Sequence, residues 1–163
     1  MLKPSKSTHQ QARMLIDTPF EEAFDNFTVL ASRLMAVPVS IVSIIDHEGD
    51  RQFFKSQCGL DHPWSKTRQT PLSHSFCRIV AESNLPLEVT DARKDDRVKD
   101  NAAIDGLGVI AYLGTPIYAA DGTPIGSFCA IDSKPRQWTD SDMDTLRRLV
   151  AGETLRVCRR PST

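Results

Sequence analysis

Residues 109–132, with the sequence VIAYLGTPIYAADGTPIGSFCAID, decide the fold of this chain. Two apolar, β-rich runs, 109–118 and 124–131, flank the tetrapeptide Ala119-Ala120-Asp121-Gly122. An Asp-Gly pair between two such runs is typical of a β-hairpin. We therefore expect this hairpin at the centre of an antiparallel sheet.

Gly114 and Gly126 interrupt the two runs. Glycine inside a strand often marks a β-bulge or a place where another group approaches the backbone closely. One face of the hairpin is therefore expected to lie under another part of the structure. A helix packed on the sheet and a bound ligand are the two interpretations of this closeness.

The composition is that of an ordinary globular protein. Hydrophobic residues make up 40% and charged residues 25% of the 163 residues, and the formal net charge is -1. A nearly neutral chain lacks the basic field that favours nucleic-acid binding. No apolar run has the length of a membrane span, and the first residues lack the apolar core of a signal peptide. We expect a cytoplasmic protein without nucleic-acid or membrane partners.

A single domain is expected, because a chain of this length buries most of its apolar surface without cross-links. Residues 1–16 are predicted to be a polar N-terminal segment that is partly disordered or forms a short helix. Residues 17–160 are predicted to form the domain, and residues 161–163 a tail.

The first long helix is predicted from Pro19 to Met35. Thr18 as N-cap, Pro19 at the first helical position and Glu21 three residues after the cap form a capping-box signature. Val37-Pro38 ends the helix. Apolar residues at spacings of three and four form one stripe that is expected to face the core. They are Phe20, Phe24, Phe27, Ala31 and Leu34.

The middle of the chain is predicted to contain short elements between turns. Valine and isoleucine alternate with serine in the first of them, which favours a strand. The predicted elements are a hairpin with strands 39–46 and 51–56, a loop at 58–69, a helix from about 73 to 84, a short strand at 85–90 and a solvated run of mixed charge at 91–101. Hairpins rather than parallel crossovers indicate an α+β domain with a mostly antiparallel sheet.

The last helix is predicted from Asp140 to Arg159, after a capping box formed by Thr139 and Asp142. Its apolar residues are expected to divide between the sheet and the surface. Met143, Leu146, Val150 and Val157 are expected to face the sheet, and Leu149 and Leu155 to point elsewhere.

These two outward leucines, together with Met14, Leu15 and Ile16, are expected to form an apolar patch. A symmetric, self-complementary interface is the commonest way to bury such a patch. We therefore expect a homodimer held through the terminal helices. The alternative is that the same leucines cover the N-terminal segment of their own domain.

Several phrases, taken together, resemble the GAF family of sensory domains. They are DTPFEEAFDNFTVLASRLMAVPVSIVSIID, SHSFC, LEVTDARKDDRVKDN, YLGTPIYAADGTPIGSFCAID and WTDSDMDTLRRLV, within residues 17–159. The resemblance implies a PAS-related fold, with an antiparallel sheet of five or six strands and the terminal helices on one face. It implies a small-molecule pocket on the other face, roofed by helices and loops. A sensory or regulatory role in bacterial-type signal transduction follows, with an output domain or partner protein.

The resemblance supplies neither a ligand nor a cofactor, because GAF domains bind different molecules. Members that bind cyclic nucleotides carry an NKFDE-type set of residues that this sequence lacks. Members that bind bilins place a histidine next to the cysteine of a pocket helix, whereas Arg78 follows Cys77 here. Members that reduce free methionine sulfoxide use cysteines in surroundings that this sequence does not reproduce.

A ligand cavity is expected between the central hairpin and the helix near residues 73–80. His74 begins that helix beside two serines, where an anion can bind, although a surface histidine is the plainer interpretation. Asp91 follows a strand end, and a solvated salt bridge with Arg93 is its alternative. The predicted ligand-binding residues are His74, Cys77, Asp91, Tyr112 and Cys129.

No catalytic or metal site is predicted. The four cysteines, at positions 58, 77, 129 and 158, contain no CxxC pair and are expected to be free thiols. The sequence also lacks a nucleophile triad, a phosphate-binding glycine loop and an HExxH motif, so we do not expect an enzyme. Two alternatives to a sensory domain stay open. They are a structural dimerisation module without a ligand and a thiol-dependent free methionine sulfoxide reductase.

Overall fold

The computed structural model describes residues 14–151. Its strands and helices follow the order that the sequence predicts, with additional short elements. In chain order they are α2 (Glu22–Met35), β1 (Val39–Asp46), β2 (Arg51–Cys58), α3 (Trp64–Thr67), β3 (Gln69–Pro71), α4 (Cys77–Ser83), β4 (Leu87–Val89), α5 (Ala103–Leu107), β5 (Ala111–Tyr118), β6 (Pro124–Asp132) and α6 (Asp140–Ala151).

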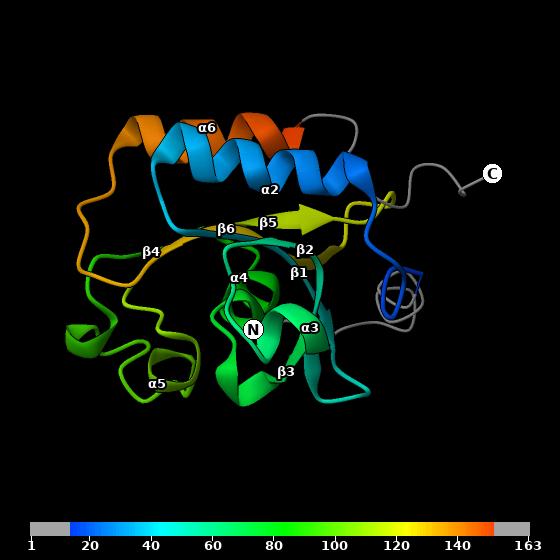
Figure 1. Cartoon of the computed structure of the whole chain (residues 1–163), viewed down its shortest axis with the longest axis horizontal. Helices are drawn as coiled ribbons and strands as arrows, with labels where there is room; N and C mark the ends of the chain where they lie inside the picture. The colour runs from blue at the N-terminus through cyan, green and yellow to red at the C-terminus, as the bar shows by residue number, and fades with distance from the viewer. Residues whose placement is uncertain (1–13, 152–163) are drawn as a thin grey trace.

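The strands form one sheet of six in the order β3-β2-β1-β6-β5-β4, and every neighbouring pair is antiparallel. Helices α2 and α6 cover one face of the sheet, and the shorter helices and loops lie on the other side (Figure 1). The α+β fold predicted from the sequence is therefore confirmed.

The central hairpin consists of β5 and β6, as predicted. The Ala119 N–H donates to the Thr123 carbonyl at 2.8 Å, and the Thr123 N–H donates to the Asp121 carboxylate at 3.0 Å. Gly122 has a φ of 88°, which a glycine adopts readily. The Asp-Gly pair thus lies in the turn between the strands, where the glycine takes the positive φ.

Gly114 and Gly126, the two glycines within the strands, lie in close contact with other parts of the same chain. A Cβ atom on Gly114 would overlap the ring of Tyr112, and a Cβ atom on Gly126 would overlap the Ser43 carbonyl of β1. The prediction of a close approach at both glycines is confirmed. The approaching groups are a side chain of the same strand and a neighbouring strand, so neither glycine indicates a helix or a ligand.

The sheet is buried on both faces. Val42 and Ile44 of β1 belong to the core beneath α2 and α6, whereas Ile41 and Ile45 belong to the core on the other face. Ser43, which separates them in sequence, is fully buried, and its hydroxyl donates to Gln52 Oε1 at 3.0 Å. A buried hydroxyl needs such a partner to avoid an uncompensated desolvation cost.

Helix α2 begins at Glu22 rather than at Pro19, and no side chain caps it. Lys55 of β2, whose side chain is fully buried, explains the difference. Its ammonium group donates to Thr18 Oγ1 at 2.7 Å and to the Pro19 carbonyl at 2.9 Å, and it pairs with Glu21 Oε2 at 2.6 Å. The predicted capping residues therefore bind the buried ammonium group of Lys55 instead of capping the helix.

The predicted stripe on α2 is partly wrong. Phe24 and Ala31 are buried as expected, but Phe20 is 45% exposed and Leu34 is 62% exposed. Thr28 and Met35 are buried in their places, because they share one helical face with Phe24 and Ala31, and Phe27 is half-buried against the same core. Thr28 is accommodated there because its hydroxyl lies 3.0 Å from Ser56 Oγ.

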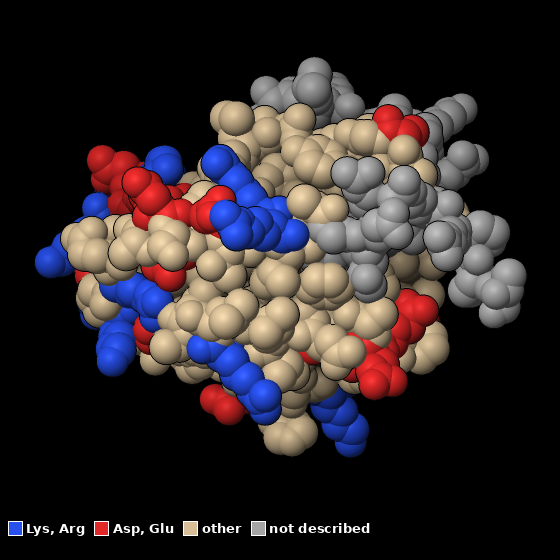
Figure 2. All heavy atoms as spheres, turned by 90° about the horizontal axis from the view of Figure 1, so that it is seen from above, with Lys and Arg blue, Asp and Glu red and all other residues tan. Residues whose placement is uncertain are grey.

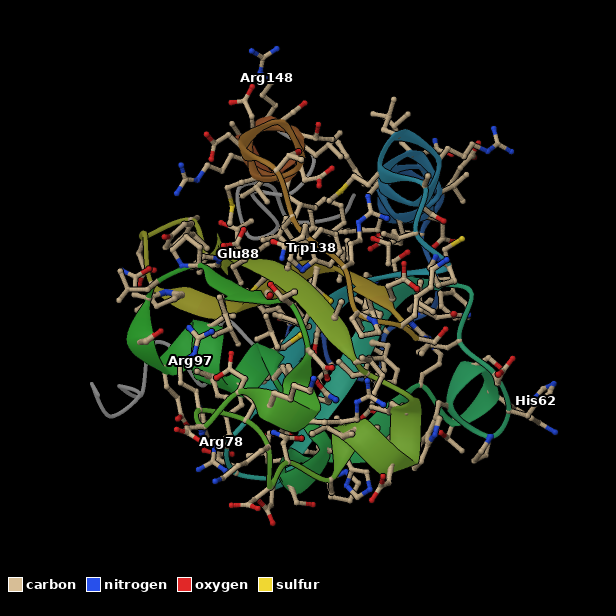
Figure 3. All side chains as sticks on the ribbon, turned by 90° about the vertical axis from the view of Figure 1, so that its left-hand side faces the viewer. His62, Arg78, Glu88, Arg97, Trp138 and Arg148 are labelled. Carbon is tan, nitrogen blue, oxygen red and sulfur yellow. The ribbon has the colours of Figure 1, made fainter. Side chains whose placement is uncertain are left out.

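Helix α6 begins with the predicted capping box. The Asp142 N–H donates to Thr139 Oγ1 at 3.1 Å, and the Thr139 N–H donates to Asp142 Oδ2 at 3.0 Å. Leu146 is fully buried, and Leu149 packs against the same core, which corrects the expectation that Leu149 points elsewhere. Trp138 lies between the sheet and α6, whereas Arg148 points outward (Figure 3).

Some predictions fall on residues that the structure does not describe. The N-terminal segment 1–13 and the continuation of the last helix beyond Ala151, with Leu155 and Val157, lie outside the described residues. Within residues 14–151, no helix combines the length and the apolar character that crossing a bilayer requires.

We predict that Thr139→Ala lowers the free energy of unfolding by about 1 kcal/mol, because the Asp142 N–H loses its side-chain acceptor. Chemical denaturation measures the change. Ser141→Ala, an exposed position two residues away, is the matched control and should stay within about 0.5 kcal/mol of the wild type. Equal losses in both variants would show that the capping box does not stabilise α6.

Candidate functional site

Three of the predicted site residues lie together beneath α4. Cys77 begins this helix, Tyr112 lies on β5 and Cys129 lies on β6. The Tyr112 hydroxyl is 3.2 Å from Cys77 Sγ and 3.0 Å from Ser127 Oγ, and the two sulfur atoms are 3.9 Å apart. The hydroxyl thus finds a partner within the protein, as a tyrosine in an apolar strand requires.

This thiol cluster is a packed part of the core. Cys77 is 4% exposed and Cys129 is 0% exposed, and the Phe76 ring packs on Tyr112 with 5.3 Å between centroids. Burial raises the pKa of Cys129 and of Tyr112. Burial also acts to raise the pKa of Cys77, but hydrogen bonds with Cys129 and Tyr112 lower it overall. A thiol that substrates cannot reach is a poor nucleophile, so this burial disfavours the reductase alternative.

His74 lies outside the thiol cluster, in the 3-10 turn Leu72–His74 before α4. Its ring centroid is 5.9 Å from that of Trp64, and its Nδ1 is 3.1 Å from Ser73 Oγ. Gly106 lies directly against the imidazole, where a Cβ atom would overlap the ring. His74 therefore packs behind Trp64 and Gly106, two residues that line the pocket described below.

Asp91 lies apart from the other candidates, at the start of the 3-10 turn Ala92–Lys94. Arg93 Nε donates to its carboxylate at 3.0 Å and Arg93 Nη2 at 2.9 Å. This hydrogen bonding lowers the pKa of Asp91. The Arg93 side chain is 56% exposed, so the pair is the solvated salt bridge that the sequence analysis gave as the alternative to a ligand-binding role for Asp91.

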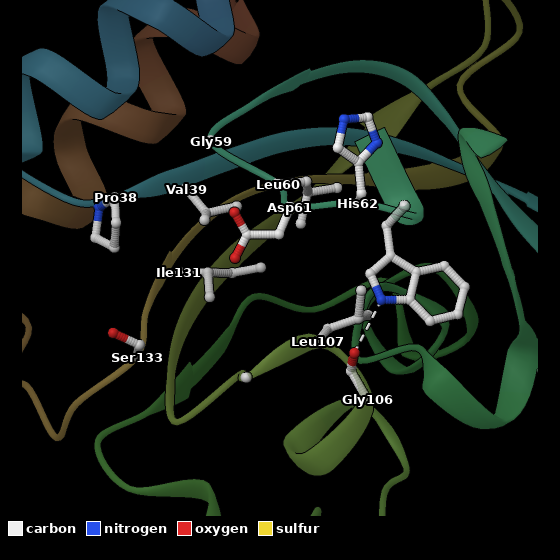
Figure 4. Close-up of a pocket in the computed structure, with 12 residues that line it drawn as sticks. Pro38, Val39, Gly59, Leu60, Asp61, His62, Gly106, Leu107, Ile131 and Ser133 are labelled. Atoms are coloured by element: carbon white, nitrogen blue, oxygen red, sulfur yellow. Dashed lines mark hydrogen bonds between the residues drawn. The ribbon is translucent and has the colours of Figure 1, made fainter. Parts of the chain in front are cut away.

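A pocket of about 530 Å³ opens on the side of the sheet opposite α2 and α6, where the start of β1 and the end of β6 meet the loop after β2 and the turn after α5 (Figure 4). Its volume lies within the range of small-molecule sites. None of the predicted site residues lines it. The lining residues are Pro38, Val39, Gly59, Leu60, Asp61, His62, Trp64, Gly106, Leu107, Gly108, Ile131 and Ser133.

Two glycines and one hydrogen bond set the shape of this pocket. Gly59 has a φ of 92° and lies so close to the Pro38 carbonyl that a Cβ atom would overlap it. Gly108 ends α5 with a φ of 70°. Both conformations favour glycine. Trp64 Nε1 donates to the Gly106 carbonyl at 2.9 Å, which joins α3 to α5 across the pocket wall (Figure 4).

The sequence prediction missed this site because it treated residues 58–69 as a loop without structure. Strand β2 extends to Cys58, helix α3 occupies Trp64–Thr67 and β3 begins at Gln69. The available signal was the occurrence of Asp61, His62 and Trp64 within four residues, soon after a strand. These residue types together offer a charge, an imidazole and an aromatic surface.

The pocket carries few polar side chains. Asp61 and His62 are its titratable residues and Ser133 adds a hydroxyl group, and the lining drawn from the described part of the chain contains no lysine or arginine. The Asp61 carboxylate is turned toward Val39 and Ile131, whereas the His62 ring points away from them (Figure 4). Within residues 14–151, no group of three His, Cys, Asp or Glu side chains is placed to hold a metal ion.

Arg68 connects the pocket wall to the segment before α2. It ends α3 in the left-handed conformation, with a φ of 56°, and its N–H donates to the Trp64 carbonyl at 2.9 Å. Its guanidinium group donates to the Thr18 carbonyl at 2.7 Å and to the Phe54 carbonyl at 3.3 Å. The same group lies 3.7 Å from the centroid of the Phe20 ring. The Arg68 side chain, at the C-terminal end of α3, thus contacts Thr18 and Phe20 in the segment that leads into α2.

Comparison with known proteins places these features in a family. The model of the GAF domain matches residues 19–152. A cyclic di-GMP phosphodiesterase from Pseudomonas aeruginosa is 36% identical over 123 residues, which cover 75% of this chain and 20% of that protein. The chain therefore spans about a fifth of the length of this relative.

Solved structures share the fold. The GAF domain of an Acinetobacter phosphoenolpyruvate-protein phosphotransferase superposes with a TM-score of 0.66 at 16% identity, over 98% of this chain and 94% of that one. A type II free methionine-R-sulfoxide reductase from Thermoplasma acidophilum gives a TM-score of 0.60 at 12% identity, over 84% and 92%. At these identities the likeness shows the fold alone. The sensory or regulatory role predicted from the sequence fits these relatives, and the chain belongs to the GAF domain family.

Proposed function

We propose that this GAF domain is a cytoplasmic regulatory module that binds a small molecule in the pocket between β1, β6 and α5. The role is regulatory rather than catalytic. The observation that carries the proposal is that the pocket wall and the entry to α2 are held by the same short helix, α3. A ligand in contact with Trp64 has a short physical path to a terminal helix.

The path runs through discrete contacts. Trp64 lines the pocket at the first residue of α3, and Arg68 ends the same helix one turn later. A shift of α3 on binding displaces the Arg68 guanidinium, which holds the Thr18 carbonyl and lies over Phe20. The start of α2 then moves relative to the sheet. Coupling of this kind requires only that the ligand bind more tightly to the shifted position of α3 than to its position in the free protein.

The output of the domain is proposed to be an enzyme of cyclic di-GMP turnover, either in the same polypeptide or as a separate partner. The support is the similarity to part of a cyclic di-GMP phosphodiesterase from Pseudomonas aeruginosa. A regulatory domain can change such an output by altering the position of its terminal helices.

We also propose a homodimer, formed by α2 rather than by the outward leucines of the last helix. Val29, Leu30 and Leu34 of α2 are 37%, 42% and 62% exposed. Figure 2 shows the face that carries α2 and α6, where residues other than Lys, Arg, Asp and Glu cover a broad area. A second copy of the same face buries these side chains in a self-complementary way.

The pocket proposal is tested by filling the pocket. We predict that the wild-type protein, incubated with a bacterial metabolite extract and analysed by native mass spectrometry, retains a bound small molecule. Leu107→Trp should lose the bound mass, because a larger side chain occupies part of the pocket that Leu107 lines. Leu85→Trp, at a position 62% exposed, is the control and should retain the mass.

Circular dichroism and thermal unfolding of both variants establish that they are folded. An identical bound mass in wild type and Leu107→Trp would place the ligand elsewhere. A wild-type protein that binds nothing would favour the structural dimerisation module over a sensor.

The dimer is tested by sedimentation at micromolar concentration. We predict that the wild type sediments at twice the monomer mass and that Leu34→Glu sediments as a monomer, because a buried carboxylate opposes association. Leu85→Glu is a matched control, since Leu85 and Leu34 are each 62% exposed. A wild type that is monomeric, or a Leu34→Glu variant that remains dimeric, would contradict an interface through α2.

A further inference from the structure

We propose that the pocket takes a small organic cation, an amine or ammonium group carried on an apolar or aromatic body. This inference rests on the proposed function, since it names the class of ligand for the same pocket. Two observations carry it: the charge of the pocket lining, and the apolar surface that surrounds that charge.

Asp61 is the acidic group of the pocket. Its carboxylate makes no hydrogen bond or ion pair with any side chain in the described part of the chain. Among the residues that the structure describes, no lysine or arginine lines the pocket to neutralise it. A ligand that covers this carboxylate without supplying a positive charge or a hydrogen-bond donor leaves it desolvated, which opposes binding. A cationic group compensates for the loss of water directly.

The imidazole of His62 does not cancel this charge. Its Nδ1 lies 3.4 Å from Ser65 Oγ, within its own loop, and its ring points away from the side of the pocket to which the Asp61 carboxylate turns (Figure 4). The negative group therefore faces the apolar side chains of Val39 and Ile131. Asp61 itself is exposed, and a cation that covers it shields the pair from part of the surrounding water, which strengthens their attraction.

The rest of the lining suits an apolar body. Leu60, Leu107, Val39 and Ile131 provide aliphatic surface, and Trp64 provides an aromatic face. The indole is held in place by the hydrogen bond from Nε1 to the Gly106 carbonyl at 2.9 Å. A fixed indole can stack on a ring or attract a cation through its π system.

Anionic ligands are disfavoured by the same lining. A phosphate or carboxylate group requires arginine, lysine or a cluster of free backbone N–H groups for its recognition. Within residues 14–151 the lining offers neither basic side chain, the N–H groups of Leu60 and Gly106 already donate to Gln57 Oε1 and to the Ala102 carbonyl, and Asp61 adds repulsion. The cyclic dinucleotide that the relative hydrolyses carries phosphodiester charges, so it does not fit this pocket as a ligand.

The experiment uses three probes of nearly equal shape: phenethylamine as the cation, 2-phenylethanol as the neutral form and phenylacetate as the anion. The chain has two tryptophans, Trp64 in the pocket and Trp138 in the core. Their indole ¹⁵N–¹H signals, assigned with Trp64→Phe, report binding at the pocket and supply an internal reference. Phenethylamine should shift the Trp64 signal saturably and leave the Trp138 signal in place.

We expect phenethylamine to bind at least about tenfold more tightly than phenylacetate, and Asp61→Asn to remove most of this preference. Asp96→Asn, at a side chain that is 93% exposed and pairs with Lys99, is the control and should keep the preference. Equal or tighter binding of phenylacetate at Trp64 would overturn the cationic class while leaving a functional pocket. No shift with any probe would also overturn this class, and the bound mass in the Leu107 experiment would then decide whether the pocket binds another kind of molecule.

Discussion

The pairing of β1 with β6 depends on the absence of a side chain at Gly126. The Ser43 carbonyl of β1 passes so close to Gly126 that any side chain there would force the two strands apart. This pairing joins the first and the last hairpin into one sheet. It also pairs Val39 with Ile131, two residues that line the pocket. The centre of the fold and one wall of the site are therefore made by the same strand contact.

On either side of this sheet, polar groups serve different purposes. The thiols of Cys77 and Cys129, with the Tyr112 hydroxyl, satisfy one another inside a packed core. Lys55 and Arg68 instead hold an irregular segment against the edge of the sheet, through the Pro19 and Thr18 carbonyls. Because backbone acceptors outside regular structure need partners, these two cations fix the direction from which the chain enters α2.

Local signals in the sequence were sufficient for most of the fold. The Asp-Gly turn, the capping box at Thr139 and the β-rich residues of β1 each act over a few residues, and the turn, the cap and the strand form as predicted, although β1 is buried on both faces. The cap expected at Thr18 failed because Lys55, distant in sequence, binds the same groups. The apolar stripe on α2 was partly misplaced, because Phe20 precedes the helix and Leu34 lies beside the buried position, which Met35 occupies.

The candidate site was less accessible to sequence analysis than the fold. Its lining comes from four separate stretches, near Pro38, Leu60, Leu107 and Ile131, and no local periodicity relates them. Cys77, Tyr112 and Cys129 were correctly placed together, but the glycine beside Tyr112 reflects core packing rather than a cavity. Asp61 and Trp64 were missed because their stretch has no repeating pattern.

The central claim is that a ligand in the pocket changes the position of the start of α2, and that Arg68 transmits this change. It is tested most directly by attaching a group to the pocket and measuring hydrogen–deuterium exchange. The variant carries Ser133→Cys in the pocket lining, with Cys58 and Cys158 replaced by serine, and its new thiol is modified with a benzyl thiosulfonate. Exchange is then followed at the N–H groups of Phe24 and Asp25, which donate to the Glu21 carbonyl at the start of α2. We predict that modification changes their exchange rates and that Arg68→Gln abolishes this change. Unaltered exchange at α2 after modification, or the same change without Arg68, would contradict the account.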